Sequence, residues 1–292
     1  MKAAFTLVAL LLCLWPATSY GQGNCTLQNI VGTYALTSTG ASTIVAGTAP
    51  DTFHWEALYG PIALVGVINI KRDGTADGKY WLVAGAWNLG LDAVPWQADV
   101  TLNSDCTGEF VSSYEGSTLI ERFVVLGNGR EIRSVATQTA VPTGNWLSTA
   151  HRIDGSPRSA HRGPCGQHKV HGDYLFECKN IFAFPPPNPS FAGAIHIRML
   201  IAPSGDYTAT VYGKVGPDST PFPAFGHLTV HDDCTAEGTL ESTFLPTVSH
   251  ARGVFFNEGK QGYWLPLANE LPDGSTVPQP YAYCVITKVE NK

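Results

Sequence analysis

An internal repeat constrains this chain more than any other feature of its sequence. The motif Cys-x6-Gly-x-Tyr occurs twice, once beginning at Cys25 and once beginning at Cys165. Two further blocks recur in the same order, pairing residues 66–71 with 193–198 and residues 101–107 with 229–235. Because three blocks in one order are hard to obtain by chance, the sequence predicts a tandem duplication.

The repeat also predicts the domain organisation. One unit is expected over residues 24–151 and a second over residues 165–292, each long enough to bury a core. Residues 152–164 between them are polar and basic and lack an apolar alternation, so they are the expected linker.

The N-terminus has the pattern of a secretory signal peptide. Lys2 precedes an apolar run over residues 3–15, which is shorter than the roughly 20 apolar residues of a membrane-spanning helix. We therefore expect a cleaved signal over residues 1–21, no membrane anchor, and a protein of the secretory pathway or the extracellular space. Asn24 lies in an Asn-x-Thr sequon next to the cleavage region and is the expected glycosylation site.

The cysteines are predicted to form disulfides. Of the seven cysteines, Cys13 leaves with the signal, and an even number in an oxidising compartment indicates disulfide bonds. Equivalent cysteines of the two units should form equivalent bonds, and the two that remain should pair with each other. The predicted bonds are Cys25–Cys106, Cys165–Cys234 and Cys178–Cys284.

The hydrophobic pattern after the signal has a period of two almost everywhere, which predicts an all-β protein. Turns are expected at Asp73-Gly74, Asp77-Gly78 and Asn128-Gly129. We expect a tandem duplication of two lipocalin-like or calycin-like β-barrels, with a sandwich as the alternative for each unit, stapled by disulfides. The predicted strands are 32–37, 63–72, 79–87, 96–102, 118–126 and 131–137 in the first unit and 172–177, 192–201, 207–212, 226–231, 238–244, 253–256, 263–267 and 281–289 in the second.

Charge and motifs exclude several classes of function. The 18 Lys and Arg against 24 Asp and Glu give a net charge of -6 without a polybasic run, so nucleic acid is not an expected partner. The sequence has no GxSxG, GxGxxG, P-loop or HExxH motif. His168 and His171 have a possible metal spacing, but no carboxylate motif accompanies them, so we expect neither a metal nor another cofactor.

Large aromatic residues are concentrated in the first unit, and the equivalent region of the second unit has no tryptophan. Such residues either fill a core or line an apolar pocket, and the asymmetry between the units favours a pocket in the first. Residues 51–59 combine aromatic and ionisable groups and form the expected pocket rim. The predicted substrate-binding residues are Trp55, Tyr59, Trp81, Trp87 and Trp96.

Polar side chains on one strand of the second unit are further candidates. His196 and Arg198 share a strand face, opposite the apolar Ile195 and Ile197. Charged groups inside a barrel are costly unless they bind a ligand or one another. The alternative is that this face is simply solvated.

A family resemblance follows from these features taken together. The signal peptide, the Asn24-Cys25-Thr26 sequon, the duplicated Cys-x6-Gly-x-Tyr and Thr-x4-Cys-Thr blocks and the all-β pattern without a hydrolytic motif resemble secreted fungal glycoproteins. These glycoproteins act as hetero-Diels-Alderases in tropolone-sesquiterpenoid biosynthesis. The resemblance covers the whole chain and implies that a hydroxylated tropolone loses water to give an ortho-quinone methide. That species then adds across a double bond of a humulene-type sesquiterpene.

Such a cycloaddition suits the sequence, because holding two apolar partners in a near-attack geometry requires neither a nucleophile nor a metal. The aromatic residues would be the walls, and His54, His196 and Arg198 are predicted as the acid for dehydration and the donors to the tropolone oxygens. Two other classes stay open. A secreted binding protein would use the same pocket without turnover, and an interaction module would use the barrels as a scaffold.

Overall fold

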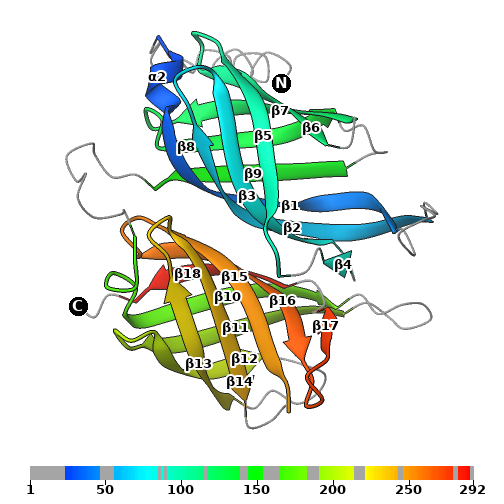
Figure 1. Cartoon of the computed structure of the whole chain (residues 1–292), viewed down its shortest axis with the longest axis vertical. Coiled ribbons are helices and arrows are strands. Elements are labelled where there is room, and N and C mark those ends of the chain that lie inside the picture. The colour runs from blue at the N-terminus through cyan, green and yellow to red at the C-terminus, as the bar shows by residue number, and fades with distance from the viewer. Residues whose placement is uncertain are drawn as a thin grey trace, which may run out of the picture.

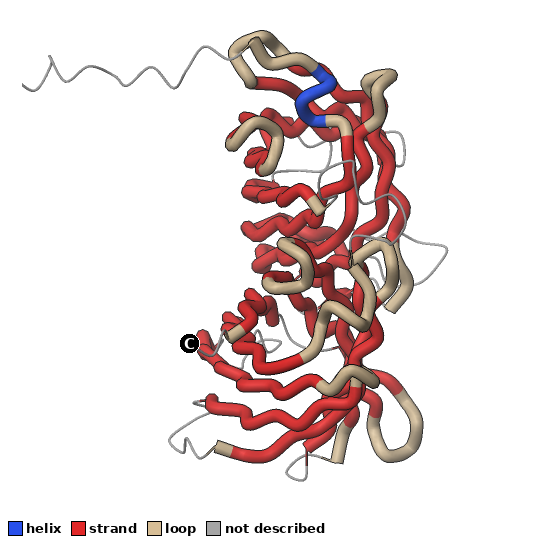
Figure 2. The backbone as a smooth tube through the Cα atoms, turned by 90° about the vertical axis from the view of Figure 1, so that its left-hand side faces the viewer, coloured by secondary structure: helices blue, strands red, loops and turns tan. Residues whose placement is uncertain are grey.

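The computed structural model describes residues 24–46, 56–84, 87–88, 91–114, 117–138, 144–153, 165–182, 191–213, 221–242, 246–278 and 282–289. Within them each half of the chain forms a closed antiparallel β-barrel, and the two barrels follow one another along the long axis of the molecule (Figure 1). The chain there is almost entirely strand, with one short helix at the far end of the first barrel (Figure 2). The predicted all-β fold of two barrels in tandem is confirmed.

The first barrel is an up-and-down meander of eight strands. Each strand pairs with its neighbour in the sequence, and pairing of β1 with β9 closes the ring, while β4 adds two residues at the end of β3. The elements are α2 (Leu27–Ile30), β1 (Gly32–Ala46), β2 (Glu56–Ile70), β3 (Thr75–Ala84), β4 (Trp87–Asn88), β5 (Val94–Leu102), β6 (Thr107–Tyr114), β7 (Ser117–Leu126), β8 (Glu131–Gln138) and β9 (Gly144–Arg152).

The second barrel repeats this topology. Pairing of β10 with β18 closes the ring, and β17 is the short extra strand, at the end of β16. The elements are β10 (Gly172–Phe182), β11 (Phe191–Ile201), β12 (Asp206–Gly213), β13 (Phe222–Val230), β14 (Thr235–Ser242), β15 (Val248–Phe256), β16 (Gln261–Glu270), β17 (Thr276–Pro278) and β18 (Ala282–Lys288).

The repeated sequence motifs build the same end of each barrel, which we call the turn end. It contains the turns after β2, β5 and β7 in the first barrel and those after β11, β13 and β15 in the second. The hydroxyl of Tyr34 lies 2.9 Å from the carbonyl oxygen of Gly129, and that of Tyr174 lies 2.9 Å from the carbonyl oxygen of Gly259. Each tyrosine is fully buried and thereby fastens β1 or β10 to a distant turn.

The three predicted disulfides are present. Cys25–Cys106 and Cys165–Cys234 occupy equivalent places, each joining the segment before the first strand of a barrel to a turn. Cys178–Cys284 joins residues that are paired in register on β10 and β18. Multiple disulfides indicate an oxidising compartment. Asn24 is exposed beside the first bond, and its glycosylation stays a prediction.

Several elements differ from the sequence-based expectation. Strands β6 and β9 were not predicted, because Gly, Ser, Thr and Asn dilute their alternation. Asp77-Gly78 is not a turn, since both residues lie inside β3 and pair with β2 and β5. Strand β9 extends to Arg152, and the amide of Ile153 still bonds to the carbonyl oxygen of Thr33, so the first barrel ends two residues later than expected.

The second repeated block was matched in the wrong register. Gly32 pairs with Ile70, and its counterpart Gly172 pairs with Ile201, so Ile70 corresponds to Ile201 rather than to Ile197. The error is four residues (201 − 197). Because side chains alternate with a period of two, a shift of four leaves the inward and outward pattern unchanged and the sequences still match.

The outer faces of the two barrels meet in an apolar interface. Strands β1, β2 and β3 of the first barrel contact β15 and β16 of the second (Figure 1). Val65 and Trp81 of the first barrel and Val254 and Leu265 of the second belong to one buried cluster, although all four point out of their own barrels. The ring of His151 on β9 also stacks on Phe256, with centroids 4.6 Å apart.

None of the described residues belongs to a helix long and apolar enough to cross a membrane.

Candidate functional site

The structure describes only part of the predicted pocket rim. His54 and Trp55 lie outside the described residues. Tyr59 lies in β2 and Trp87 in β4, and for both only the backbone is described. Their predicted roles in substrate binding or catalysis stay predictions.

The two described tryptophans of the predicted wall face opposite sides of the first barrel. Trp81 points outward, is 5% exposed in the interface between the barrels, and donates its indole N–H to the carbonyl oxygen of Leu91 at 3.1 Å. Trp96 points inward and meets Phe110 edge to face, with ring centroids 5.9 Å apart. Of this pair, Trp96 alone lies where a ligand inside the first barrel could contact it.

His196 and Arg198 lie on the solvent face of the second barrel, which is the alternative that the sequence left open. Their side chains are 56% and 63% exposed. Arg198 donates hydrogen bonds from Nε and Nη2 to the two carboxylate oxygens of Asp173, and this hydrogen-bonded ion pair raises the pKa of Arg198. The inward face of β11 is apolar, and Met199 on it is buried. Neither residue therefore lines a barrel interior, and their catalytic roles stay predictions.

A polar cluster inside the first barrel was not predicted. The carboxylate of Glu121 on β7 accepts hydrogen bonds from the hydroxyl of Ser134 at 2.7 Å and from the indole N–H of Trp146 at 3.1 Å. The hydroxyl of Ser148 lies 3.5 Å from the same carboxylate and 2.6 Å from the hydroxyl of Ser38. We call these five residues, from β1, β7, β8 and β9, the Glu121 cluster.

The strand register explains why these side chains meet. Ser38 pairs with Ser148, and Ser148 pairs with Ser134, so the three serines form a row across adjacent strands on the inner face. Glu121 lies on the same inner face, because it pairs with the inward-facing residues Phe110 on β6 and Ala136 on β8. The serines are 3 to 7% exposed, whereas Glu121 and Trp146 are half-buried, so the carboxylate borders the sealed layer of hydroxyls.

Aromatic residues lie next to the Glu121 cluster on the side of the turn end. Phe110 and Phe123 are buried with ring centroids 4.5 Å apart, and Phe110 is paired with Glu121 across β6 and β7. Gly108 makes room for the ring of Phe123, because a Cβ there would come within 2.4 Å of it. The inside of the first barrel thus contains the packed pair Phe110 and Phe123, the Glu121 carboxylate on the strand next to Phe110, and two indoles. Trp96 meets Phe110, and Trp146 donates to Glu121.

The second barrel has different residues at the positions that correspond to the Glu121 cluster. Its pair Cys178 and Cys284 occupies the places of Ser38 and Ser148, and this pair is joined by a disulfide. The partner of Cys284 on the next strand is Trp264, where the first barrel has Ser134. Glu121 in the first barrel corresponds to Ala251 in the second. A register shift lies directly before each of these two residues.

Trp264 occupies space that the first barrel gives to two phenylalanines. A Cβ on Gly238 or Gly253 would come within 2.9 Å or 2.2 Å of its indole, which also meets Phe176 edge to face at 6.1 Å. Gly238 and Gly253 are the counterparts of Phe110 and Phe123. The two interiors are therefore packed by different means, and among the described residues Glu121 is a carboxylate of the first interior that has no counterpart in the second.

The sequence contains a signal that could have identified Glu121. Glu121, Phe123 and Val125 alternate along β7, and the last two are buried. A carboxylate in line with an apolar face is unusual unless it is paired. The serines carry no comparable signal, since serine is common on both faces of a strand.

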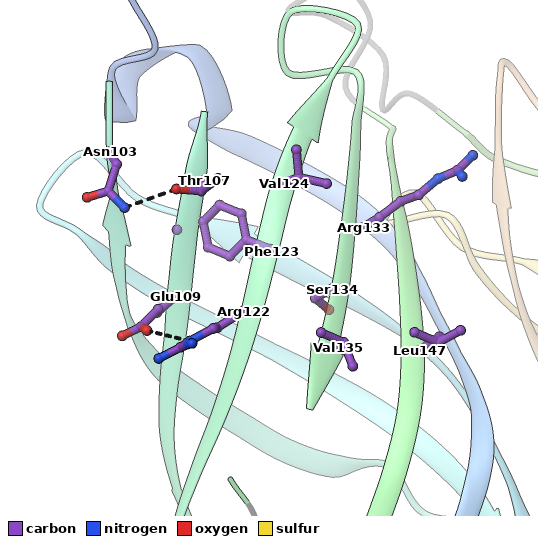
Figure 3. A pocket seen from close by; sticks show the side chains of 11 residues that line it. Asn103, Thr107, Glu109, Arg122, Phe123, Val124, Arg133, Ser134, Val135 and Leu147 are labelled. Carbon is purple, nitrogen blue, oxygen red and sulfur yellow. Dashed lines mark hydrogen bonds and ion pairs between the residues drawn. The ribbon is translucent and has the colours of Figure 1, made fainter. Parts of the chain in front are cut away.

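A groove also lies on the outer face of the first barrel, over β6 to β9 (Figure 3). It has a volume of about 620 Å³. Val124, Val135 and Leu147 line it and are 38%, 39% and 66% exposed, beside the ion pair of Arg122 with Glu109. Within the part of the chain that the structure describes, no three His, Cys, Asp or Glu side chains gather as metal ligands would.

The sequence matches no known protein family, and no curated protein matches it significantly. Similar solved structures include a protein of unknown function from the DUF3598 family of Nostoc punctiforme, which is 10% identical with a TM-score of 0.28 and covers 92% of this chain and 99% of its own. Intact Ap-TbpB and the isotype 1 transferrin binding protein B of serogroup B Neisseria meningitidis are each 8% identical with a TM-score of 0.28. They cover 89% of this chain and 77% and 76% of their own.

Proposed function

We propose that this protein is a secreted, cofactor-independent hetero-Diels-Alderase. It joins a tropolone ortho-quinone methide, formed by dehydration, to a humulene-type sesquiterpene, as the resemblance of its sequence implies. The observation that supports a site in the first barrel is the Glu121 cluster, in which one carboxylate lies next to the packed rings of Phe110 and Phe123 inside the barrel.

The arrangement suits the reaction for physical reasons. Aromatic side chains such as Trp96 and Phe110 can hold two apolar rings face to face, which replaces a bimolecular encounter by an intramolecular one. Effective molarities of such arrangements reach about 10⁵ M and above when the geometry is close to that of attack. A fixed carboxylate with aligned donors orients the polar end of one partner, so that a single face is presented to the other.

A second candidate is a secreted protein that binds an apolar small molecule without turnover. The observation that favours it is the position of His196 and Arg198, which lie on the outside of the second barrel. The described residues of the Glu121 cluster include no imidazole or cation that could act as a general acid.

Product analysis separates the two candidates. The purified mature protein is supplied with a hydroxymethyl-tropolone precursor and a humulene-type alcohol, and products are resolved by chiral chromatography with mass spectrometry. Accelerated formation of one stereoisomer of the adduct is the expected result. A product mixture identical to the protein-free control, together with saturable binding of either compound, would establish the binding protein instead.

A further inference from the structure

We propose that the interior of the first barrel is a binding site for an apolar ring compound bearing a hydroxyl group, and that the carboxylate of Glu121 accepts the hydrogen bond of that hydroxyl. The described residues of the second barrel include no equivalent carboxylate, and we assign that barrel a structural role. This inference deepens the proposed function, on which it rests for the identity of the natural ligand.

The chemistry of the Glu121 cluster determines the class of ligand. An ionised carboxylate accepts hydrogen bonds at about four positions and donates none. Ser134 and Ser148 approach one carboxylate oxygen, Oε2, and Trp146 approaches the other, Oε1. A ligand that binds this carboxylate must therefore bring a donor. A hydroxyl is a donor that an apolar ring can carry without a charge of its own, and it is the donor of the hydroxylated tropolone in the proposed function.

The surroundings require the rest of that ligand to be apolar. Phe110 and Phe123 are buried beneath the carboxylate, and Trp96 packs on Phe110. Stacking and edge contacts with these rings favour a flat aromatic or conjugated ring. Because Glu121 and Trp146 keep part of their surface accessible while the serines do not, the open side of the cluster is the side of the carboxylate and the indole.

The second barrel provides the comparison that separates a ligand site from a structural network. An eight-stranded barrel of this topology needs no buried polar group at these positions, since Cys178, Cys284, Trp264 and Ala251 fill them with a disulfide and an indole. Placing a carboxylate in a barrel interior costs free energy unless its hydrogen bonds are satisfied. The first barrel carries that cost and surrounds the carboxylate with three donors, from Ser134, Ser148 and Trp146, which is expected of a group that must be held in one position.

The test compares two probes that differ only in the donor, 2-naphthol and 2-methoxynaphthalene, by fluorescence titration of the intact mature protein. Hydrogen bonds to charged groups are stronger than those between neutral groups, so we expect the wild type to bind 2-naphthol about tenfold more tightly than the methyl ether. Glu121→Gln should abolish most of this preference. Glu109→Gln, on the outer face of the same barrel, should retain it.

A second variant, Glu121→Ala, keeps the test informative if Glu121→Gln does not fold. Glu121→Ala places alanine where the second barrel already has Ala251, so the fold accommodates it, and the preference for 2-naphthol should again be lost. An unchanged preference in both Glu121 variants would overturn the inference, as would a wild type that binds neither probe.

The binding test and the product analysis can fail independently, so failure of the Glu121 site can be told apart from failure of the proposed activity. A Glu121-dependent preference without adduct formation leaves the binding site in place and refutes the Diels-Alderase. Adduct formation with an unchanged preference in Glu121→Gln refutes the role of Glu121 alone.

Discussion

Two buried tyrosines show what single residues contribute to this fold. Tyr34 and Tyr174 belong to the repeated sequence motif, and each donates its hydroxyl to a turn carbonyl far away in the sequence. Burial raises the pKa of the Tyr174 phenol to about 12, so the donor stays protonated through the neutral range. The repeat therefore preserves a hydrogen bond that holds the first strand of each barrel to its turn end.

We expect Tyr34→Phe and Tyr174→Phe each to lower the free energy of unfolding by about 1 to 2 kcal/mol, because each leaves a buried carbonyl with one partner fewer. The measurement is the urea unfolding curve of each variant. Tyr212→Phe is the control, since Tyr212 is 50% exposed and its replacement should change the midpoint little. Equal midpoints for all three variants would show that the two turn contacts are dispensable.

At the same scale, the sequence identified some site residues and not others. An alternation of side chains predicts which residues share a face but does not say which face is inside. Trp81 was predicted to line a pocket, yet it packs between the barrels, because a second apolar body covers that outer face. Glu121 was not among the predicted site residues, because its role depends on Ser134 and Trp146, which are brought near it only by the strand register.

At the scale of strands, the all-β pattern, the disulfides and most strands could be predicted, while register could not. The repeat correctly paired the cysteines because a covalent bond needs two specific residues. The match of residues 66–71 was out of register because a strand shifted by four residues buries the same face. Strands β6 and β9 were missed because their polar small residues reduce the alternation on which the prediction depended.

The correct register gives a prediction about strands β1 and β9. Ser38 and Ser148 face each other with hydroxyl oxygens 2.6 Å apart, at the positions that Cys178 and Cys284 occupy in the second barrel. We expect the double variant Ser38→Cys and Ser148→Cys to form a fourth disulfide, because the backbone geometry of a bonded pair is already present. The bond should raise the midpoint of thermal unfolding, since it closes a long loop in the unfolded chain.

Mass spectrometry of the alkylated, non-reduced double variant detects the bond, and the two single variants serve as controls. A pair of free thiols in the double variant would show that β1 and β9 are not held in the register described here.

At the scale of the whole molecule, the interface between the barrels predicts that they unfold together. Leu265 and Val254 point out of the second barrel and yet are fully buried. Leu265→Ala should therefore cost about 2 to 5 kcal/mol, as is typical of a buried leucine. Lys79→Ala should cost about 1 kcal/mol or less, because its ion pair with Asp233 across the interface is partly exposed and screened by water.

Urea unfolding followed by both far-ultraviolet circular dichroism and tryptophan fluorescence measures the effect. A single transition that moves as a whole in Leu265→Ala is the expected result. Two separate unfolding transitions in the wild type would contradict the prediction that the interface makes the two barrels unfold together.

We expect His151 to make this interface sensitive to acid. Burial lowers the pKa of His151 from its ordinary value of 6.5, an effect that Arg133 reinforces and Glu131 opposes. Between the lowered pKa and 6.5 the unfolded chain binds more protons at this position than the folded protein does, so stability falls as the pH falls through that window. The imidazole is stacked on Phe256, and its protonation places a cation against the apolar face of the second barrel.

His151→Phe keeps an aromatic ring on Phe256 and removes the titrating group. We expect its thermal midpoint to fall less between pH 7 and pH 5 than that of the wild type, whereas His168→Phe, at an exposed turn position, should follow the wild type. Differential scanning calorimetry across this range measures both. A parallel decline of all three proteins would mean that the acid sensitivity arises from other titrating groups of the molecule, because the stacked imidazole is the one group that His151→Phe removes.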